Sequence, residues 1–276
     1  MLKKILIKAR RAVFSGVIGD NTTLLKGEGY DFVELREYEA GEDIKNIDWT
    51  ISAKMQKPYV KVFHAQRELN ISIVPILTGS VYFGTSRLKQ DVISEVCAIL
   101  GYSCIKQGDS FDSFIANEQV ILNTRKTKKI FGVSSMVEKI STYQTLGKKI
   151  SYNNLANTLF KSIRKKSLIF LIGDFFNISS LDLRILAKKH EVVAIVVRDK
   201  FEEHPEALGS VNLVDPENNK LFSGDINNSL VRDYELKIRQ NDHVLYEHFQ
   251  KCNIKFTKLY THEEPLSKLI PLMSRR

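Results

Sequence analysis

An uncharged apolar run from Leu168 to Gly173 is the feature that most constrains the fold of this 276-residue chain. Its residues carry no charge and are followed directly by Asp174, a pattern typical of a strand that is buried on both faces. The run from Leu69 to Leu77 begins with alternating residues and ends as a continuous apolar stretch, which indicates a second central strand. Helical patterns lie between such strands, so we expect an α/β fold with a mostly parallel sheet and helices on both faces.

The remaining segments alternate between helical and strand patterns. Helices are predicted over residues 2–14, 86–106, 133–143, 154–165, 180–189 and 226–252 and from Glu264 onward, strands over 110–116, 119–122, 191–197 and 254–259, and a hairpin over 211–214 and 220–222. Residues 59–63 are predicted to form a hairpin with the strand at 69–77. Pro75 cannot donate a ladder hydrogen bond, so a strand end or a bulge is expected there.

No repeat or low-complexity linker interrupts the chain. We therefore predict one Rossmann-like α/β domain at residues 57–276, with a small β insertion, preceded by an N-terminal extension at residues 1–56. Apolar residues at helical spacing, separated by lysines and arginines, make residues 2–14 a basic amphipathic helix. This helix is expected either to pack on the domain or to dock on anionic lipid or a partner.

The composition describes a folded protein with an excess of positive charge. The formal net charge of +9 favours an anionic neighbour, without choosing between nucleic acid, lipid and acidic protein. Cys97, Cys104 and Cys252 have no CxxC or zinc spacing, so buried reduced thiols in a cytoplasmic protein are expected. Residues 1–11 are too charged for a signal peptide, and no apolar run approaches the ~20 residues of a membrane helix. Contact with a membrane would be peripheral at most.

The run from Glu34 to Trp49 concentrates acidic side chains, two cations and the only tryptophan of the chain. It has neither the spacing of metal ligands nor that of a phosphate loop, so a solvated charged loop is one interpretation. Against it, a lone tryptophan is usually well buried and would order its neighbours. The acidic side chains either pair inside the chain or present a charged patch to a partner. We expect Arg36 and Asp48 to form an internal ion pair that pins this loop onto the sheet.

The same stretch resembles the signature of domain-of-unknown-function family 58, and the similarity continues over roughly residues 27–216. The matching positions are Gly29-Tyr30-Asp31-Phe32, Leu35-Arg36-Glu37-Tyr38, Gly41-Glu42-Asp43, Ile47-Asp48-Trp49 and Ser52-Ala53-Lys54. Members of this bacterial family carry a von Willebrand factor A-like domain and are typically encoded beside MoxR-type AAA+ ATPases. The resemblance implies a von Willebrand A-like fold. It assigns a structural role to the signature residues Arg36, Tyr38, Gly41, Asp43, Asp48 and Trp49.

The resemblance also implies a magnesium site that this chain has partly lost. Von Willebrand A-like domains hold Mg²⁺ with Asp-x-Ser-x-Ser in one loop, a Thr in a second and an Asp in a third, because a hard cation prefers oxygen ligands. The ligand positions that remain here are Thr78, Ser80 and Asp174. Alignment on Phe83-Gly84 puts Ile76 at the first Asp, and Asn153 or Asn154 falls at the Thr.

We therefore expect a degenerate, MIDAS-like site (a relic of the metal-ion-dependent adhesion site) that binds Mg²⁺ weakly or not at all, and no other cofactor. A different origin for Asp174 is open, because a carboxylate that caps the helix predicted from Ser180 would give the same pattern.

These observations favour a non-catalytic interaction module, an adaptor or partner of a MoxR-type AAA+ ATPase in the assembly or activation of an unknown client protein. One alternative is a metal-dependent enzyme at Thr78, Ser80 and Asp174, although Ser80 lacks the Gly-x-Ser-x-Gly elbow and no motif places a His beside it. The other is a binder of anionic membrane or nucleic acid through the basic residues of 3–11 and 125–129. Nucleic acid is the less favoured ligand, because neither cluster interleaves aromatic residues for stacking.

Overall fold

The computed structural model describes residues 2–14, 32–40, 42–63 and 68–274. Contacts divide the chain into two compact units. The small unit runs from Lys26 to Glu68, and the main unit combines Met1–Leu25 with Leu69–Arg276. This division differs from a boundary after residue 56, because β2 (Tyr59–Phe63) belongs to the small unit and α1 (Leu2–Phe14) to the main unit.

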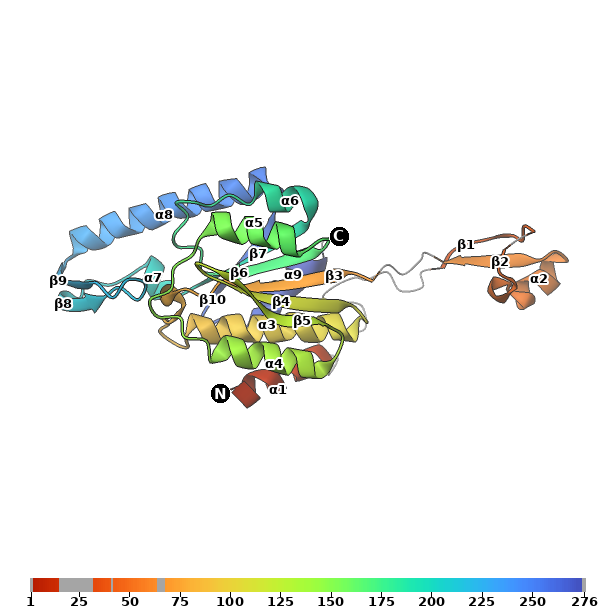
Figure 1. Ribbon diagram of the computed structural model, residues 1–276, viewed down its shortest axis with the longest axis horizontal. Coiled ribbons are helices and arrows are strands. Elements are labelled where there is room, and N and C mark those ends of the chain that lie inside the picture. Colours follow the sequence, from red (N-terminus) through yellow and green to blue (C-terminus); the bar gives the residue numbers. More distant parts are fainter. Residues whose placement is uncertain (1, 15–31, 41, 64–67, 275–276) are drawn as a thin grey trace. The chain divides into compact units, whose positions relative to one another are not determined.

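The main unit is built on a six-stranded sheet with the order β10-β7-β6-β3-β4-β5 (Figure 1). Its strands are β3 (Asn70–Pro75), β4 (Ser110–Ala116), β5 (Val120–Thr127), β6 (Leu168–Gly173), β7 (Glu191–Arg198) and β10 (Lys255–Tyr260). Neighbouring strands pair in parallel except β4 and β5, which are antiparallel at one edge. The predicted α/β fold with a mostly parallel sheet is confirmed, and every residue of β6 is buried.

Helices cover both faces of this sheet, as its apolar strands require. One face carries α1, α3 (Lys89–Lys106), α4 (Ile130–Ser141) and α9 (Pro265–Ser274), and the other carries α5 (Tyr152–Ser162), α6 (Arg184–Lys189) and α8 (Asn228–Lys251) (Figure 1). Strand β6 divides its side chains between the two cores. Phe170 packs with the first set of helices, and its neighbours Ile169 and Leu171 pack with the second.

Helix α1 packs on the main unit, in agreement with the first of the two expectations for it. Ala9 and Val13 are buried in the core that α3 and α4 share. Its Lys8 extends across to two acidic residues of the same unit, with Nζ 3.0 Å from the Glu95 carboxylate and 2.8 Å from that of Glu264. The apolar side of this basic helix is therefore used inside the fold.

The hairpin predicted between residues 59–63 and 69–77 is wrong. β2 pairs antiparallel with β1 (Phe32–Glu37) in the small unit, whereas β3 pairs in parallel with β4 and β6. A strand buried on both faces, as β3 is, takes its partners from the parallel sheet on both edges. The strand end expected near Pro75 is confirmed, because Pro75 is the last residue of β3 and the following amide, Ile76 N, donates to Ile172 O.

Two further elements extend from the carboxyl end of the sheet. β8 (Gly209–Val214) and β9 (Leu221–Ile226) form the predicted hairpin, which lies near the start of α8 (Figure 1). A short helix that the sequence analysis missed, α7 (Lys200–Glu203), connects β7 to this hairpin. None of the helices in the described residues is long and apolar enough to cross a membrane.

Candidate functional site

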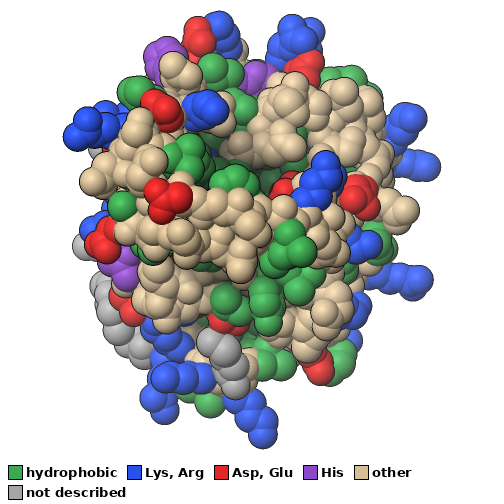
Figure 2. Space-filling view, turned by 90° about the vertical axis from the view of Figure 1, so that its left-hand side faces the viewer, with side chains coloured by type: hydrophobic (Ala, Val, Ile, Leu, Met, Phe, Trp, Pro, Cys, Tyr) green, Lys and Arg blue, Asp and Glu red, His purple; other side chains and the backbone are tan. Residues whose placement is uncertain are grey.

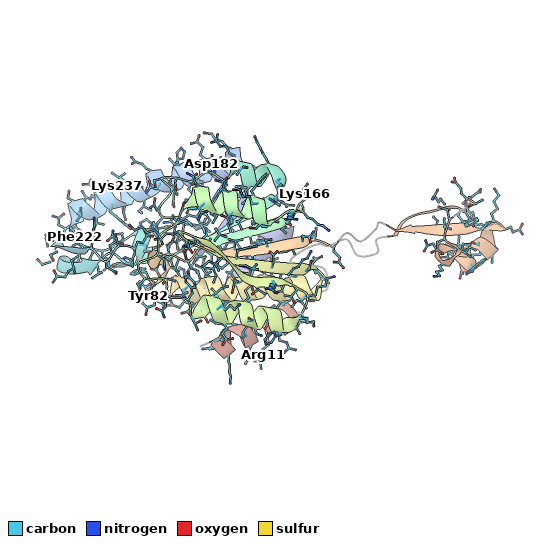
Figure 3. The ribbon with its side chains drawn as sticks, in the orientation of Figure 1. Arg11, Tyr82, Lys166, Asp182, Phe222 and Lys237 are labelled. Atoms are coloured by element: carbon cyan, nitrogen blue, oxygen red, sulfur yellow. The ribbon has the colours of Figure 1, made fainter. Side chains whose placement is uncertain are left out.

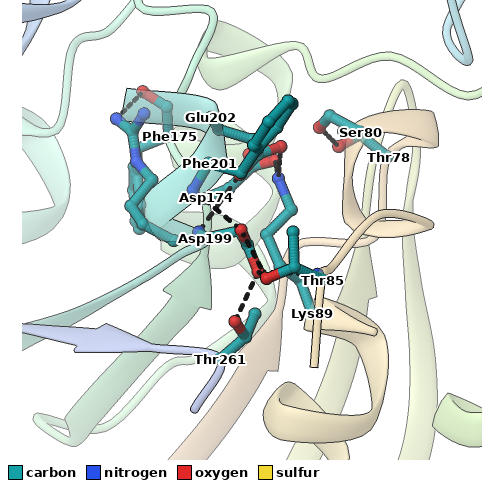
Figure 4. A network of polar contacts seen from close by, with 11 residues as sticks. Thr78, Ser80, Thr85, Lys89, Asp174, Phe175, Asp199, Phe201, Glu202 and Thr261 are labelled. Atoms are coloured by element: carbon teal, nitrogen blue, oxygen red, sulfur yellow. Dashed lines mark hydrogen bonds and ion pairs between the residues drawn. The ribbon is translucent and has the colours of Figure 1, made fainter. Parts of the chain in front are cut away.

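The carboxyl ends of β3, β6 and β7 lead into loops that carry polar side chains (Figure 4). Thr78 and Ser80 follow β3, Asp174 follows β6, and Asp199 follows β7. Parallel strands end at the same edge of a sheet, which is where α/β folds place their ligands. These loops form one polar cluster.

Lys89, the first residue of α3, provides the central positive charge of this cluster. Its side chain is fully buried, with Nζ 3.0 Å from Asp174 Oδ2 and 2.6 Å from Glu202 Oε1 (Figure 4). The ring of Phe176 lies 4.8 Å from the same nitrogen and adds its electron-rich face. The two carboxylates come from separate parts of the chain, one at the end of β6 and one on α7.

The two carboxylates respond to this environment in opposite ways. Burial by itself would raise the pKa of Asp174, but the Lys89 charge, the Ser80 hydroxyl and Arg198 outweigh burial and hold that pKa below its usual value. For Glu202 burial dominates over the attraction of Lys89, and the pKa is raised. The site therefore contains a firmly ionised Asp174 and a Glu202 that is more easily protonated.

The three predicted metal ligands are brought together, but they do not form an open metal site. Thr78 Oγ1 and Ser80 Oγ lie 2.8 Å apart, and the Ser80 hydroxyl contributes to the lowered pKa of Asp174. Lys89 Nζ already takes the carboxylate oxygens, so the side chains as arranged do not fit Mg²⁺. Across the described residues, no group of three or more His, Cys, Asp and Glu side chains could hold a metal ion.

The structure also bears on the alternative origin of Asp174 and on the position aligned with the second-loop Thr. The carboxylate of Asp174 binds Lys89 and not a helix N-terminus, and the helix in question, α6, begins only at Arg184. Asn153 and Asn154 are exposed residues of α5, and the Asn154 amide donates to Glu118 O. The site therefore draws its fourth polar group from Glu202 rather than from α5.

Asp199 organises the protein next to this cluster. Its buried carboxylate accepts hydrogen bonds from Thr85 N, Thr85 Oγ1, Phe201 N and Thr261 Oγ1 (Figure 4). Glu202 Oε2 in turn accepts from Asp199 N, which completes a capping box at the start of α7. Because Oε1 of the same Glu202 binds Lys89, the cap of α7 and the Lys89 cluster form one connected network.

An apolar groove of about 430 Å³ lies directly beside this network. It is lined by residues of α7 and the segment after it, of the β8–β9 hairpin and of α8, together with one from the loop after β3; they include Phe83, Phe201, Leu213, Phe222, Leu230 and Tyr234. Figure 2 faces this end of the main unit and shows apolar side chains gathered around a hollow. Phe222 on the hairpin and Lys237 on α8 mark the same end in Figure 3.

The signature residues of the small unit act chiefly as caps and turn-formers. The Asp48 carboxylate accepts from Thr50 N and Ile51 N at the start of α2 (Trp49–Met55). The Asp43 carboxylate accepts from Lys45 N and caps a short 3-10 helix, η1 (Ile44–Asn46). Tyr38 N donates to Pro58 O and holds β1 to the segment before β2. Gly41, the remaining signature residue, lies outside the described residues.

Two expectations for this unit are wrong. Arg36 pairs with Glu42 and, at 3.9 Å, with Glu39, whereas the Asp48 carboxylate is used to cap α2. Trp49 is not buried, since 66% of it is exposed. The small unit offers little interior in which an indole could be enclosed, because its buried described side chains are Ser52 and Val60.

Comparison with known proteins identifies the family. The model of the family described as "Protein of unknown function DUF58" matches residues 34–244. The chain belongs to this family. Uncharacterized proteins of Mycobacterium tuberculosis and Mycobacterium bovis are similar to this DUF58 chain, at 24% identity over 263 residues that cover 94% of this chain and 83% of theirs.

Two solved structures are similar to parts of this DUF58 chain. The conserved hypothetical protein BatB from Bacteroides thetaiotaomicron covers 67% of this chain with 98% of its own, at 9% identity and a TM-score of 0.41. An aerotolerance-related membrane protein from Bacteroides fragilis has the same coverages, at 10% identity and a TM-score of 0.40.

Sequence reasoning on this DUF58 chain missed Lys89, Glu202 and Asp199. Lys89 follows a polar stretch at the start of a helix, where lysine is normally solvated. Its partner Glu202 is 113 residues away, and nothing local connects the two. Asp199 did carry a signal, because an Asp at the end of a buried strand with Glu three residues later is the pattern of a capping box.

Proposed function

We propose that this chain is a protein-interaction module without catalytic activity of its own, and that its partner is a MoxR-type AAA+ ATPase that assembles or activates other proteins. The identity of the partner comes from the signature resemblance at residues 27–62. The interaction role rests on one observation, the apolar groove at the carboxyl end of the sheet. Apolar grooves of this kind recur as sites that bind the apolar face of a segment of another protein.

The charges around the groove favour a particular kind of occupant. Glu206 and Asp233 line it beside apolar side chains, and Lys237 is the one cation of the lining residues in the described part of the chain. Glu202 also lines the groove, but Lys89 already compensates its charge. On a chain of net charge +9, this acidic rim fits an ATPase segment with apolar side chains flanked by Lys or Arg.

We also infer that the main unit is von Willebrand A-like, with the interaction face at the end where such domains bind their ligands. Thr78, Ser80 and Asp174 would then be the remainder of the metal motif, with Ile76 in the place of the first carboxylate. A metal-dependent enzyme at these residues is less well supported, because Lys89 engages the Asp174 carboxylate.

Binding of an anionic membrane is also less well supported than the interaction role. The apolar side of α1, which would have to enter a lipid surface, packs against α3 and α4. The basic residues 125–129 lie on and just after an edge strand, and the pocket beside them is lined mainly by polar and charged residues.

The test is co-purification of the tagged full-length chain from native lysate, followed by mass spectrometry. Leu213 and Phe222 are register partners that line the groove, whereas the next pair on the same hairpin, Val214 and Leu221, does not line it. We expect recovery of a MoxR-type ATPase, loss of it with Leu213→Asp/Phe222→Asp, and retention of it with Val214→Asp/Leu221→Asp.

The two double variants are matched, since both introduce the same charges into the same two strands and both replace exposed apolar residues. Failure to recover any AAA+ ATPase, or equal recovery from both variants, would count against the proposal.

A further inference from the structure

We propose that the Lys89 ammonium is the resident cation of the oxygen-lined site at the carboxyl end of the sheet. It takes the place that a divalent metal ion would take among these oxygens, and it ties α7 to the end of β6. The inference concerns the chemistry inside the site and does not depend on the identity of any partner.

The oxygens around Lys89 are those that a hard cation would select. Asp174 and Glu202 supply carboxylates, and the loop after β3 supplies the hydroxyls of Thr78 and Ser80, whose oxygens lie 2.8 Å apart. In this structure the carboxylate oxygens point to Lys89 Nζ, at 3.0 and 2.6 Å. An ammonium carries one charge and three donors, so it can serve two carboxylates at once and leave the site compact.

Burial and a backbone hydrogen bond hold Lys89 in contact with the two carboxylates. Its side chain is 0% exposed, and its backbone amide donates to Phe83 O at 2.8 Å, which fixes the start of α3 against the loop after β3. A metal ion could enter only if the ammonium gave up both carboxylates, and the buried Lys89 would then be left without its anionic partners. We infer that the site is occupied by the chain itself in every folded molecule.

Lys89 is also a positioning residue for the groove. Glu202 lies on α7 next to Phe201, whose ring lines the groove and lies 6.4 Å from that of Phe83. One contact of Lys89 therefore reaches the end of β6 and the other reaches the wall of the groove. Removal of the ammonium should loosen α7 first, because this short helix has few backbone hydrogen bonds of its own.

Manganese binding, observed through the electron paramagnetic resonance of free Mn²⁺, tests the first part. Lys89→Ala leaves the two carboxylates and a space, whereas Lys89→Met removes the charge and fills most of that space. We expect one Mn²⁺ to bind Lys89→Ala with a dissociation constant of about 1 mM or tighter. We expect no binding to the wild-type chain, to Lys89→Met or to the double variant Lys89→Ala/Asp174→Asn.

Backbone hydrogen exchange, measured by mass spectrometry, tests the second part. In Lys89→Met the peptide that covers 199–208 should exchange at least about tenfold faster than in the wild-type chain, while the peptide that covers 120–127 should not change. In Lys89→Ala, Mn²⁺ should restore slow exchange at 199–208, which a loss of packing alone would not allow.

Either of two results overturns the proposal. The first is a wild-type chain that binds Mn²⁺ in a way that Asp174→Asn abolishes, since the site would then prefer the metal. The second is a folded Lys89→Ala chain that binds no more Mn²⁺ than the double variant. If Lys89→Ala does not fold, the Mn²⁺ titration of the wild-type chain and the hydrogen exchange of Lys89→Met still test the proposal. Unchanged exchange at 199–208 in Lys89→Met would refute the link to α7.

Discussion

At the scale of single residues, Lys89 and Lys8 have the same kind of partners in different surroundings. Each ammonium contacts two carboxylates, those of Asp174 and Glu202 for Lys89 and those of Glu95 and Glu264 for Lys8. The Lys89 side chain is 0% exposed, whereas 42% of the Lys8 side chain is exposed. Water can replace the partners of a surface charge but not those of a buried one, so burial decides what each lysine contributes.

We expect Lys89→Met to lower the free energy of unfolding by about 3–5 kcal/mol at neutral pH, because it removes the cation that contacts both the buried Asp174 carboxylate and Glu202. Lys8→Met, the matched control, should cost less than about 1 kcal/mol, because Lys8 itself is partly exposed and its buried partner Glu95 keeps Arg87. Urea denaturation followed by circular dichroism measures both. An equal decrease in the free energy of unfolding for the two variants would show that the burial of Lys89 does not increase its contribution to stability.

The loss caused by Lys89→Met should shrink as the pH falls. In the wild-type chain the pKa of Asp174 is lowered, so its stabilisation is complete above the unfolded-state pKa and is lost as the pH falls through the folded one. Lys89 is the largest influence that lowers this pKa, so the Asp174 pKa of the variant should be higher than that of the wild-type chain, and acid should cost the variant less stability. The same denaturation series, extended from neutral pH to about pH 4, checks the sign; a gap that widens toward acid would contradict this account.

At the scale of elements, the small helix α7 depends on two acidic residues at its start. Asp199 is 0% exposed and accepts from Thr85, Phe201 and Thr261, while Glu202 closes the capping box and binds Lys89. These contacts join α7 to the loop after β3 and to the segment after β10. α7 is too short to hold its own position, so these hydrogen bonds fix the part of the groove wall that it forms.

Asp199→Ala should lower the free energy of unfolding by about 2–4 kcal/mol, because it removes the N-cap acceptor of α7 and leaves the buried Thr261 hydroxyl and two backbone amides without their acceptor. Asp182→Ala is the control, since Asp182 also accepts a backbone hydrogen bond near a helix start, from Arg184 N, but its side chain is 39% exposed. Its loss should stay within about 1 kcal/mol. Thermal and urea unfolding of both variants provide the comparison, and a small loss for Asp199→Ala would rule out its organising role.

Elements were predictable from sequence where a local pattern determined them. The apolar run of β6 and the punctuated hairpin of β8 and β9 both appear where expected, because each depends on neighbours a few residues away. The pairing of β2 with β1 was not predictable in this way, since strand pairing depends on contacts between residues far apart in the sequence. In the site, Asp174 was predictable as a site residue because it directly follows β6. Its ion pair with Lys89 was not, because that contact depends on how α3 packs against the sheet.

At the scale of the whole molecule, the two compact units differ in the interior that each provides. The main unit has a large apolar core on each face of its sheet, whereas the buried described side chains of the small unit are Ser52 and Val60. Small units bury a smaller fraction of their surface and are correspondingly marginal. This is also why the expectation of a buried Trp49 fails.

Native-state hydrogen exchange at increasing urea should therefore separate the two units. We expect amides of β1, β2 and α2 to exchange at lower urea than amides of β3 and β6, which serve as the internal reference in the same sample. Mass spectrometry of peptides from 32–63 and from 168–173 follows both. Exchange of both sets in one transition would mean that the chain unfolds as a single cooperative unit.

Because β5 is an edge strand, the basic residues 125–129 have a second consequence, which concerns contacts between molecules. β5 pairs with β4 alone in the described sheet, so its other side presents backbone donors and acceptors that a strand of a second molecule could use. Arg125, Lys126 and Lys128 are exposed at or next to this edge. Two copies that joined here would bring these like charges together, so the positive charge that suggested a ligand also keeps the sheets of separate molecules apart.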